Sequence, residues 1–100
     1  MVGCKEERGM NSYAHKVDNN QKQIVDELRA LGYTVANLSR AGAGIPDLVV
    51  GDNQRIVWVE IKRKGQKLTP YEQAFFNEWA ECTRIIAYCT EDVLRWFGRL

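Results

Sequence analysis

The sequence lacks any apolar run that approaches the ~20 residues needed to cross a bilayer, which excludes a membrane-spanning helix. Its opening residues, MVGCKEERGMNSYAHK, lack the apolar core of a secretory signal. Cysteine is scarce, because only Cys4, Cys82 and Cys89 occur, in an odd number and without metal-ligand spacing. These absences favour a protein of the reducing cytoplasm, which is the host cytoplasm if a phage encodes it.

The sequence also lacks an excess of charge of one sign. Its 14 basic and 13 acidic residues leave a formal charge of +1, which excludes a polycation that binds nucleic acid by charge alone. With 45% hydrophobic residues, the 100 residues have the composition of one globular domain with a modest core. Residues 55–67 are locally basic, with five basic residues against one acid. Such a run is either a solvated edge or a surface for phosphates.

The hydrophobic pattern predicts an α/β chain in the order α-β-β-β-α-β-α. Residues 1–17 have no periodicity and are predicted to form a flexible arm, and residues 18–100 a single domain. The first helix is expected to start at one of the cap residues 18–20. Strands are predicted at residues 33–38, 45–51, 55–62 and 84–89.

The last two helices have recognisable starts. Thr69 is the predicted N-cap of the second helix, followed by Pro70, and Glu72 completes a capping box. The final helix is predicted over residues 90–100, with Thr90 as its expected cap. The helices therefore alternate with the later strands, as in an α/β fold.

Charged residues interrupt the second and third predicted strands. A symmetric turn between these strands places Asp47 directly opposite Glu60, whereas a turn shifted by one residue places it diagonally. Either register brings both carboxylates to one face of the sheet. Lys62 shares that face, because it lies two residues after Glu60. Two acids and one ammonium are therefore expected to converge at one end of the sheet.

Opposed carboxylates destabilise a strand pair unless something neutralises them. A divalent cation would do so, because two carboxylates, a backbone carbonyl and waters form the hard-oxygen site that suits Mg²⁺ or Mn²⁺. The alternative is a buried Asp-Lys-Glu charge network with a structural purpose only. The positions by themselves leave both interpretations open.

Pro46-Asp47, followed thirteen positions later by Glu60-Ile61-Lys62, resembles the PD-(D/E)xK nuclease signature. The segments SRAGAGIPDLVV and VWVEIKRKGQKLTPYEQ are most similar to the stand-alone virus-type replication-repair nuclease (VRR-NUC) domain. Archaeal-type Holliday-junction resolvases are close relatives of that domain. The resemblance covers roughly residues 20 to 90 and implies a restriction-endonuclease-like core, with a mixed central sheet flanked by helices.

The resemblance also implies catalytic and metal-binding roles. Asp47 and Glu60 would ligate Mg²⁺ or Mn²⁺, with the backbone carbonyl of Ile61 as a third ligand. Lys62 would position and help to deprotonate the attacking water. Gln73 matches the glutamine that follows the LTP element in this family and should face the site, unless it is simply an exposed helix residue.

Other matched positions concern DNA and the metal shell. Phosphate contacts and close backbone approach to DNA are expected from Arg40, Arg63, Lys64, Lys67, Gly42 and Gly44. The two glycines alternatively serve only a turn. Many relatives carry a glutamate on the first helix where this sequence has Gln21, whose helical phase directs it to the sheet. That neutral amide would reach the metal only through a water, and Glu27 is a poorer candidate.

The resemblance therefore implies a divalent-metal-dependent endonuclease of DNA repair that hydrolyses phosphodiester bonds in branched DNA and resolves four-way (Holliday) junctions. The alternatives are a flap- or restriction-type nuclease on the same core and a catalytically inactive nucleic-acid-binding module. A homodimer is expected, because two-fold symmetry matches that of a four-way junction. The apolar residues available for its interface, or for the core, are Trp79, Trp96, Phe97 and Leu100.

Overall fold

The computed structural model of the protein describes residues 14–100, and it describes their side chains from residue 20 onward. The seven elements are α1 (Ala14–Ala30), β1 (Thr34–Asn37), β2 (Leu48–Gly51), β3 (Ile56–Ile61), α2 (Pro70–Glu78), β4 (Arg84–Ala87) and α3 (Thr90–Trp96). This order confirms the predicted α/β fold. Helix α1 begins earlier than the predicted start at 18–20, and most of the predicted arm lies outside the described residues.

The four strands form one mixed sheet in the order β1-β2-β3-β4. The first three strands are antiparallel, and β4 runs parallel to β3 because the connection between them passes through α2. In the β2–β3 pair, Leu48 pairs with Val59 and Gly51 with Ile56. This is the symmetric register of the two predicted, and it brings Asp47, the residue before Leu48, level with Glu60, the residue after Val59.

The turn between β2 and β3 is held by the side chain of Asp52. Its Oδ1 accepts hydrogen bonds from the backbone N–H of Gln54 at 2.7 Å and of Arg55 at 2.8 Å. These backbone hydrogen bonds lower the pKa of Asp52. Because the turn length sets the register of a hairpin, Asp52 contributes to the alignment of the acids at the other end of the strands.

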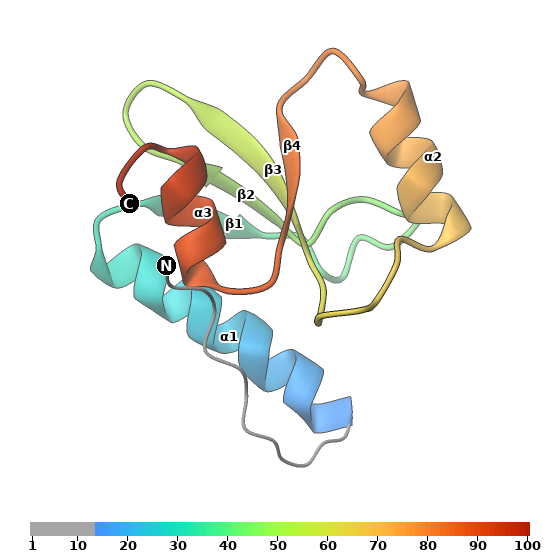
Figure 1. The fold of residues 1–100 in the computed structure, drawn as a ribbon, viewed down its shortest axis with the longest axis horizontal. Helices are drawn as coiled ribbons and strands as arrows, with labels where there is room; N and C mark the ends of the chain where they lie inside the picture. The colour runs from blue at the N-terminus through green and yellow to red at the C-terminus, as the bar shows by residue number, and fades with distance from the viewer. Residues whose placement is uncertain (1–13) are drawn as a thin grey trace.

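The hydrophobic core lies between one face of the sheet and the helices α1 and α3. Figure 1 shows these two helices next to each other, with α2 set apart from both. The buried apolar side chains of this core are Ile24, Val25, Leu28, Tyr33, Val35, Leu48, Val50, Val57, Val59, Ile61, Ala87, Val93 and Phe97. Alternate residues of β3 point into it, as the period of a strand requires. Phe97 is thus a core residue rather than part of a free surface.

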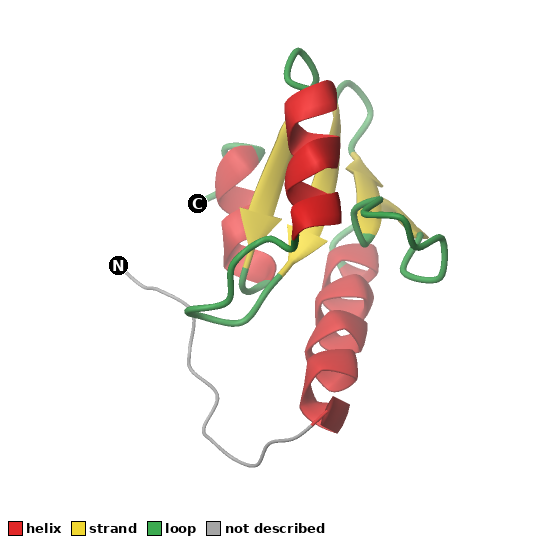
Figure 2. Ribbon diagram, turned by 90° about the vertical axis from the view of Figure 1, so that its right-hand side faces the viewer, coloured by secondary structure: helices red, strands yellow, loops and turns green. Residues whose placement is uncertain are grey.

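Helix α2 covers the opposite face of the sheet. Figure 2 shows α2 in front of the strands and α3 behind them. Trp58 of β3 contacts Phe75 and Trp79 of α2, with ring centroids 5.3 and 5.8 Å apart. Arg84 of β4 donates a hydrogen bond of 2.8 Å to the carbonyl of Phe76. These contacts leave part of this sheet face open, and Trp79 is 40% exposed.

Helix α2 starts as the sequence predicts, whereas α3 does not. The hydroxyl of Thr69 accepts a hydrogen bond from the N–H of Glu72, whose carboxylate accepts one from the N–H of Thr69. Thr90, by contrast, is the first residue inside α3 and not its cap. Its hydroxyl donates a 2.6 Å hydrogen bond to Glu27 of α1. A carboxylate acceptor on a packed neighbour makes a stronger hydrogen bond than a backbone cap, which explains the difference.

None of the helices in the part of the chain that the structure describes has the length and apolar character needed to span a membrane.

Candidate metal-binding and catalytic site

The predicted acids and lysine come together where β2 begins and β3 ends. Asp47 lies immediately before β2, at the level of Glu60 near the end of β3. Its Oδ2 accepts a hydrogen bond of 2.8 Å from the backbone N–H of Ile61. Glu60 and Lys62 are both buried, with exposed fractions of 3% and 8%. The start of α2 covers this end of the sheet and supplies a further charged group.

That further group is Glu72, which the sequence pattern indicates only as part of the capping box. The Lys62 ammonium lies 2.7 Å from Oε1 of Glu72 and 3.7 Å from Oε2 of Glu60. The capping box itself was the available signal, because it turns the Glu72 side chain back toward the start of α2. What could not be read from the sequence is that this helix start packs against the end of β3.

Burial and mutual repulsion perturb the acids. Burial, followed by the charges of Asp47 and Glu72, raises the pKa of Glu60 to about 8. Burial also raises the pKa of Asp47, and the hydrogen bond from Ile61 opposes this effect. For Glu72, burial is the largest effect and raises the pKa, but the hydrogen bonds from Lys62 and from the backbone of Thr69, together with smaller effects, outweigh it, so the pKa of Glu72 is lowered. The lysine therefore neutralises Glu72 well and Glu60 poorly.

The site has the features of a binding place for a cation. Oε1 of Glu60 is buried and has no hydrogen-bond partner. A buried acceptor without a donor is costly, and a hard cation is one group that would satisfy it. Asp47 and Glu60 are a small donor set, because the described residues contain no cluster of three or more His, Cys, Asp or Glu that could hold a metal. Backbone carbonyls and waters would have to complete the shell.

The two glutamines predicted for the site have other partners in the structure. Gln73 is exposed, and its amide donates a 3.0 Å hydrogen bond to Asn77 of the same helix. These contacts agree with the alternative that Gln73 is an exposed helix residue, whereas Glu72, which points about 100° away from it around the helix, contacts Lys62. Gln21 does reach the sheet, where its amide donates to Asn37 at 3.1 Å. Asn37 pairs with Leu48, so Gln21 lies one strand away from the acids.

Four predicted phosphate contacts lie on loops beside this end of the sheet. The exposed residues are Arg40, Arg63, Lys64 and Lys67. Arg40 belongs to the loop between β1 and β2, and the other three belong to the loop between β3 and α2. Because these loops flank the acids, the four cations can contact a polyanion that crosses the site.

The two predicted glycines differ from each other. Both have positive φ, at 72° for Gly42 and 81° for Gly44. A side chain at Gly42 would meet open space, as close approach to DNA requires. A side chain at Gly44 would instead collide with the backbone carbonyl of Tyr71. Gly44 therefore serves the packing of the β1–β2 loop against α2, in agreement with the alternative of a structural role.

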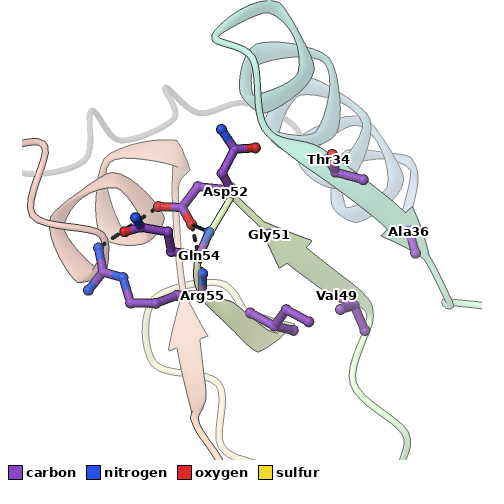
Figure 3. Close-up of a pocket in the computed structure, with 9 residues that line it drawn as sticks. Thr34, Ala36, Val49, Gly51, Asp52, Gln54 and Arg55 are labelled. Atoms are coloured by element: carbon purple, nitrogen blue, oxygen red, sulfur yellow. Dashed lines mark hydrogen bonds and ion pairs between the residues drawn. The ribbon is translucent and has the colours of Figure 1, made fainter.

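A surface hollow lies on the sheet face that carries the acids, but at the opposite end of the strands, beside the β2–β3 turn (Figure 3). It has a volume of about 350 Å³ and is lined by Thr34, Ala36, Val49, Gly51, Asp52, Asn53, Gln54, Arg55 and Ile56. The carboxylate of its one acid, Asp52, is occupied by the turn and lies 4.0 Å from Arg55. None of the predicted site residues lines this hollow, so it is separate from the acidic site.

No protein-family model matches the sequence. A solved structure described as a VRR_NUC domain superposes with a TM-score of 0.67 and 24% identity, covering 83% of this chain and 95% of that one. The chain therefore has the VRR-NUC fold, which confirms the fold that the sequence resemblance implied.

A sequence relative comes from Acyrthosiphon pisum secondary endosymbiont phage 1, where it is described as "Putative nuclease p44". The two proteins are 39% identical in an alignment of 57 positions, which covers 55% of this chain and 61% of the phage protein. The matched segment thus spans less than two thirds of that relative.

Proposed function

We propose that the protein is a divalent-metal-dependent DNA endonuclease that hydrolyses phosphodiester bonds in branched DNA. The observation that carries the proposal is the half-buried Asp47, which lies level with the buried Glu60 and beside the buried Lys62 at one end of the sheet. Buried like charges are unfavourable for folding, and such perturbed groups are concentrated at functional sites. Their position in a VRR-NUC fold, together with the description of the phage relative, supports a nuclease.

In this proposal Asp47, Glu60 and the carbonyl of Ile61 hold Mg²⁺ or Mn²⁺. When bound, the cation would supply Lewis acidity toward the phosphate and the attacking water. The Lys62 ammonium would hold that water and stabilise the negative charge that develops on the phosphate. Gln21 would assist through a water, which requires its amide to leave Asn37.

The choice of branched DNA rests on the form of the domain. The exposed cations of the two loops bind phosphates without reading bases, so selection would depend on the shape of the DNA. A homodimer would set two sites at a fixed separation and match the symmetry of a four-way junction. Trp79 and Leu100 are exposed and available for its interface, whereas Trp96 is half-buried against the core. We keep the cytoplasm as the proposed compartment.

A cleavage assay on linear, flap and four-way DNAs of shared sequence tests this function. With Mn²⁺ or Mg²⁺, the protein should cut the four-way junction on opposed strands. Cleavage should be lost when EDTA removes the metal, and also in the Glu60→Gln variant. Sedimentation at micromolar concentration should give a dimer. The absence of both binding and cleavage on every DNA would refute the proposal.

The same assay separates the alternatives. Cleavage restricted to flaps, by a monomer, would indicate a flap nuclease, and sequence-specific cleavage of linear duplex would indicate a restriction-type enzyme. Metal-independent binding without cleavage would indicate an inactive nucleic-acid-binding module. The retention of Asp47, Glu60 and Lys62 together favours the enzyme over this last alternative, because a module that only binds DNA has no need of buried acids.

A further inference from the structure

The catalytic lysine of the proposed reaction lies between two glutamates and is closer to one of them. The Lys62 ammonium is 2.7 Å from Glu72 but 3.7 Å from Glu60. The first distance is that of a charge-assisted hydrogen bond, and the second is that of a looser ion pair. The other oxygen of Glu60, Oε1, is buried and has no hydrogen-bond partner.

Glu72 is held where it is by contacts that do not involve the lysine. Its carboxylate accepts a 2.8 Å hydrogen bond from the N–H of Thr69, and Thr69 in turn caps the helix. From the other side, Gly44 packs directly on the backbone carbonyl of Tyr71, the residue before Glu72. The first turn of α2 is thus fixed from two directions, so Glu72 offers the lysine an anchor in a constant position.

We propose that Glu72 is a positioning residue that holds the Lys62 ammonium away from Glu60 and so keeps Glu60 available to a cation. Without Glu72, the buried ammonium would have Glu60 as its near acid and would form a close pair with it. That pair would compete with the metal for the same carboxylate. The inference rests on the proposed function, because it assigns the purpose of the arrangement to metal binding.

A double-mutant cycle read by Mn²⁺ binding tests this role without any DNA. Binding is measured by paramagnetic resonance titration for the wild type, Glu72→Gln, Lys62→Met and the double variant. Glutamine can still accept the N–H of Thr69 and thus keep the capping box, while it removes the charge. Methionine keeps much of the lysine stem and removes the ammonium.

If Glu72 acts through Lys62, Glu72→Gln should weaken Mn²⁺ binding about threefold or more when the lysine is present, and much less in the Lys62→Met background. If Glu72 acts only as one more negative charge near the metal, the loss will be equal or larger in that background. An equal or larger loss would overturn the inference.

Thr69→Ala is the matched control, because it removes the cap hydroxyl and leaves Glu72 in place. It should lower the melting temperature without moving the Mn²⁺ midpoint. An equal weakening of Mn²⁺ binding by Thr69→Ala and Glu72→Gln would mean that Glu72 only stabilises the helix, and would also overturn the inference. A coupled cycle in a protein that cuts no DNA would retain the positioning role and refute the proposed function, whereas cleavage without coupling would do the reverse.

Discussion

The carboxylate of Asp47 accepts a hydrogen bond from the backbone N–H of Ile61, across the β2–β3 pair, at 2.8 Å. The acid that begins one strand is therefore oriented by the backbone of the next, beside Glu60. This orientation does not require a cation, so the site is organised by the hairpin itself. Asp47 therefore has two properties that can be tested separately: one substitution can remove its charge alone, and another can remove its hydrogen bond as well.

Asp47→Asn should abolish metal binding and cleavage while it keeps the hydrogen bond to Ile61. Because it relieves the repulsion with Glu60, the metal-free variant should melt at the same temperature as the wild type or higher. Asp47→Ala leaves the N–H of Ile61 without its acceptor and should be destabilised by about 1–3 kcal/mol. Thermal melts with and without Mn²⁺ measure both. Unfolding of the asparagine variant would instead support the purely structural charge network.

The stability of the metal-free protein should fall as the pH rises from about 4.5 to about 8. The folded protein raises the pKa of Glu60 to about 8, above the ordinary 4.5, so it retains a proton that the unfolded chain releases. A raised acid pKa favours the folded state at low pH, and this advantage is lost as the pH approaches the folded value. Melting temperatures across this range provide the test. Glu60→Gln should remove most of the slope, and a slope unchanged in that variant would contradict the assignment.

Lys64→Ala and Lys67→Ala should each weaken DNA binding for all sequences and reduce its salt dependence by about one phosphate contact. Lys62→Ala should abolish turnover and leave binding nearly intact, because that side chain is buried at the site. Arg95→Ala is the control, since Arg95 is exposed on α3, which covers the other face of the sheet. Binding isotherms at several salt concentrations measure these effects. A loss of binding in Lys62→Ala or Arg95→Ala as large as that in Lys64→Ala and Lys67→Ala would mean that the basic residues are divided wrongly.

Gly44→Ala should destabilise the protein more than Gly42→Ala. Both positions have positive φ, which costs a non-glycine residue about 1 kcal/mol. The added methyl group meets open space at Gly42 but the carbonyl of Tyr71 at Gly44, so only the second variant must displace α2. We expect a further loss of about 1–3 kcal/mol from that overpacking, measured by urea unfolding. Equal losses of stability in the two variants would show that α2 can move away from an added methyl group at little cost.

Much of the fold follows from short-range patterns in the sequence. The Thr69–Glu72 capping box, the strand alternation and the β2–β3 turn each act over a few residues, so the order of elements and the face shared by the acids could be predicted, while two registers stayed open. The meeting of Asp47, Glu60 and Lys62 follows from that register. The start of α1 was misplaced, because a polar helix start has no apolar period to mark it.

The sequence by itself therefore determined the hairpin and the acidic pair that it carries, since both depend on local spacing. Only the tertiary structure decided what packs against them. Glu72 rather than Gln73 contacts the lysine, and close packing against the carbonyl of Tyr71 explains the glycine at position 44. Both outcomes depend on how α2 sits against the end of β3 and the preceding loop. That placement is set by packing between elements distant in sequence, such as the contacts of Trp58 with Phe75 and Trp79, which no local pattern encodes.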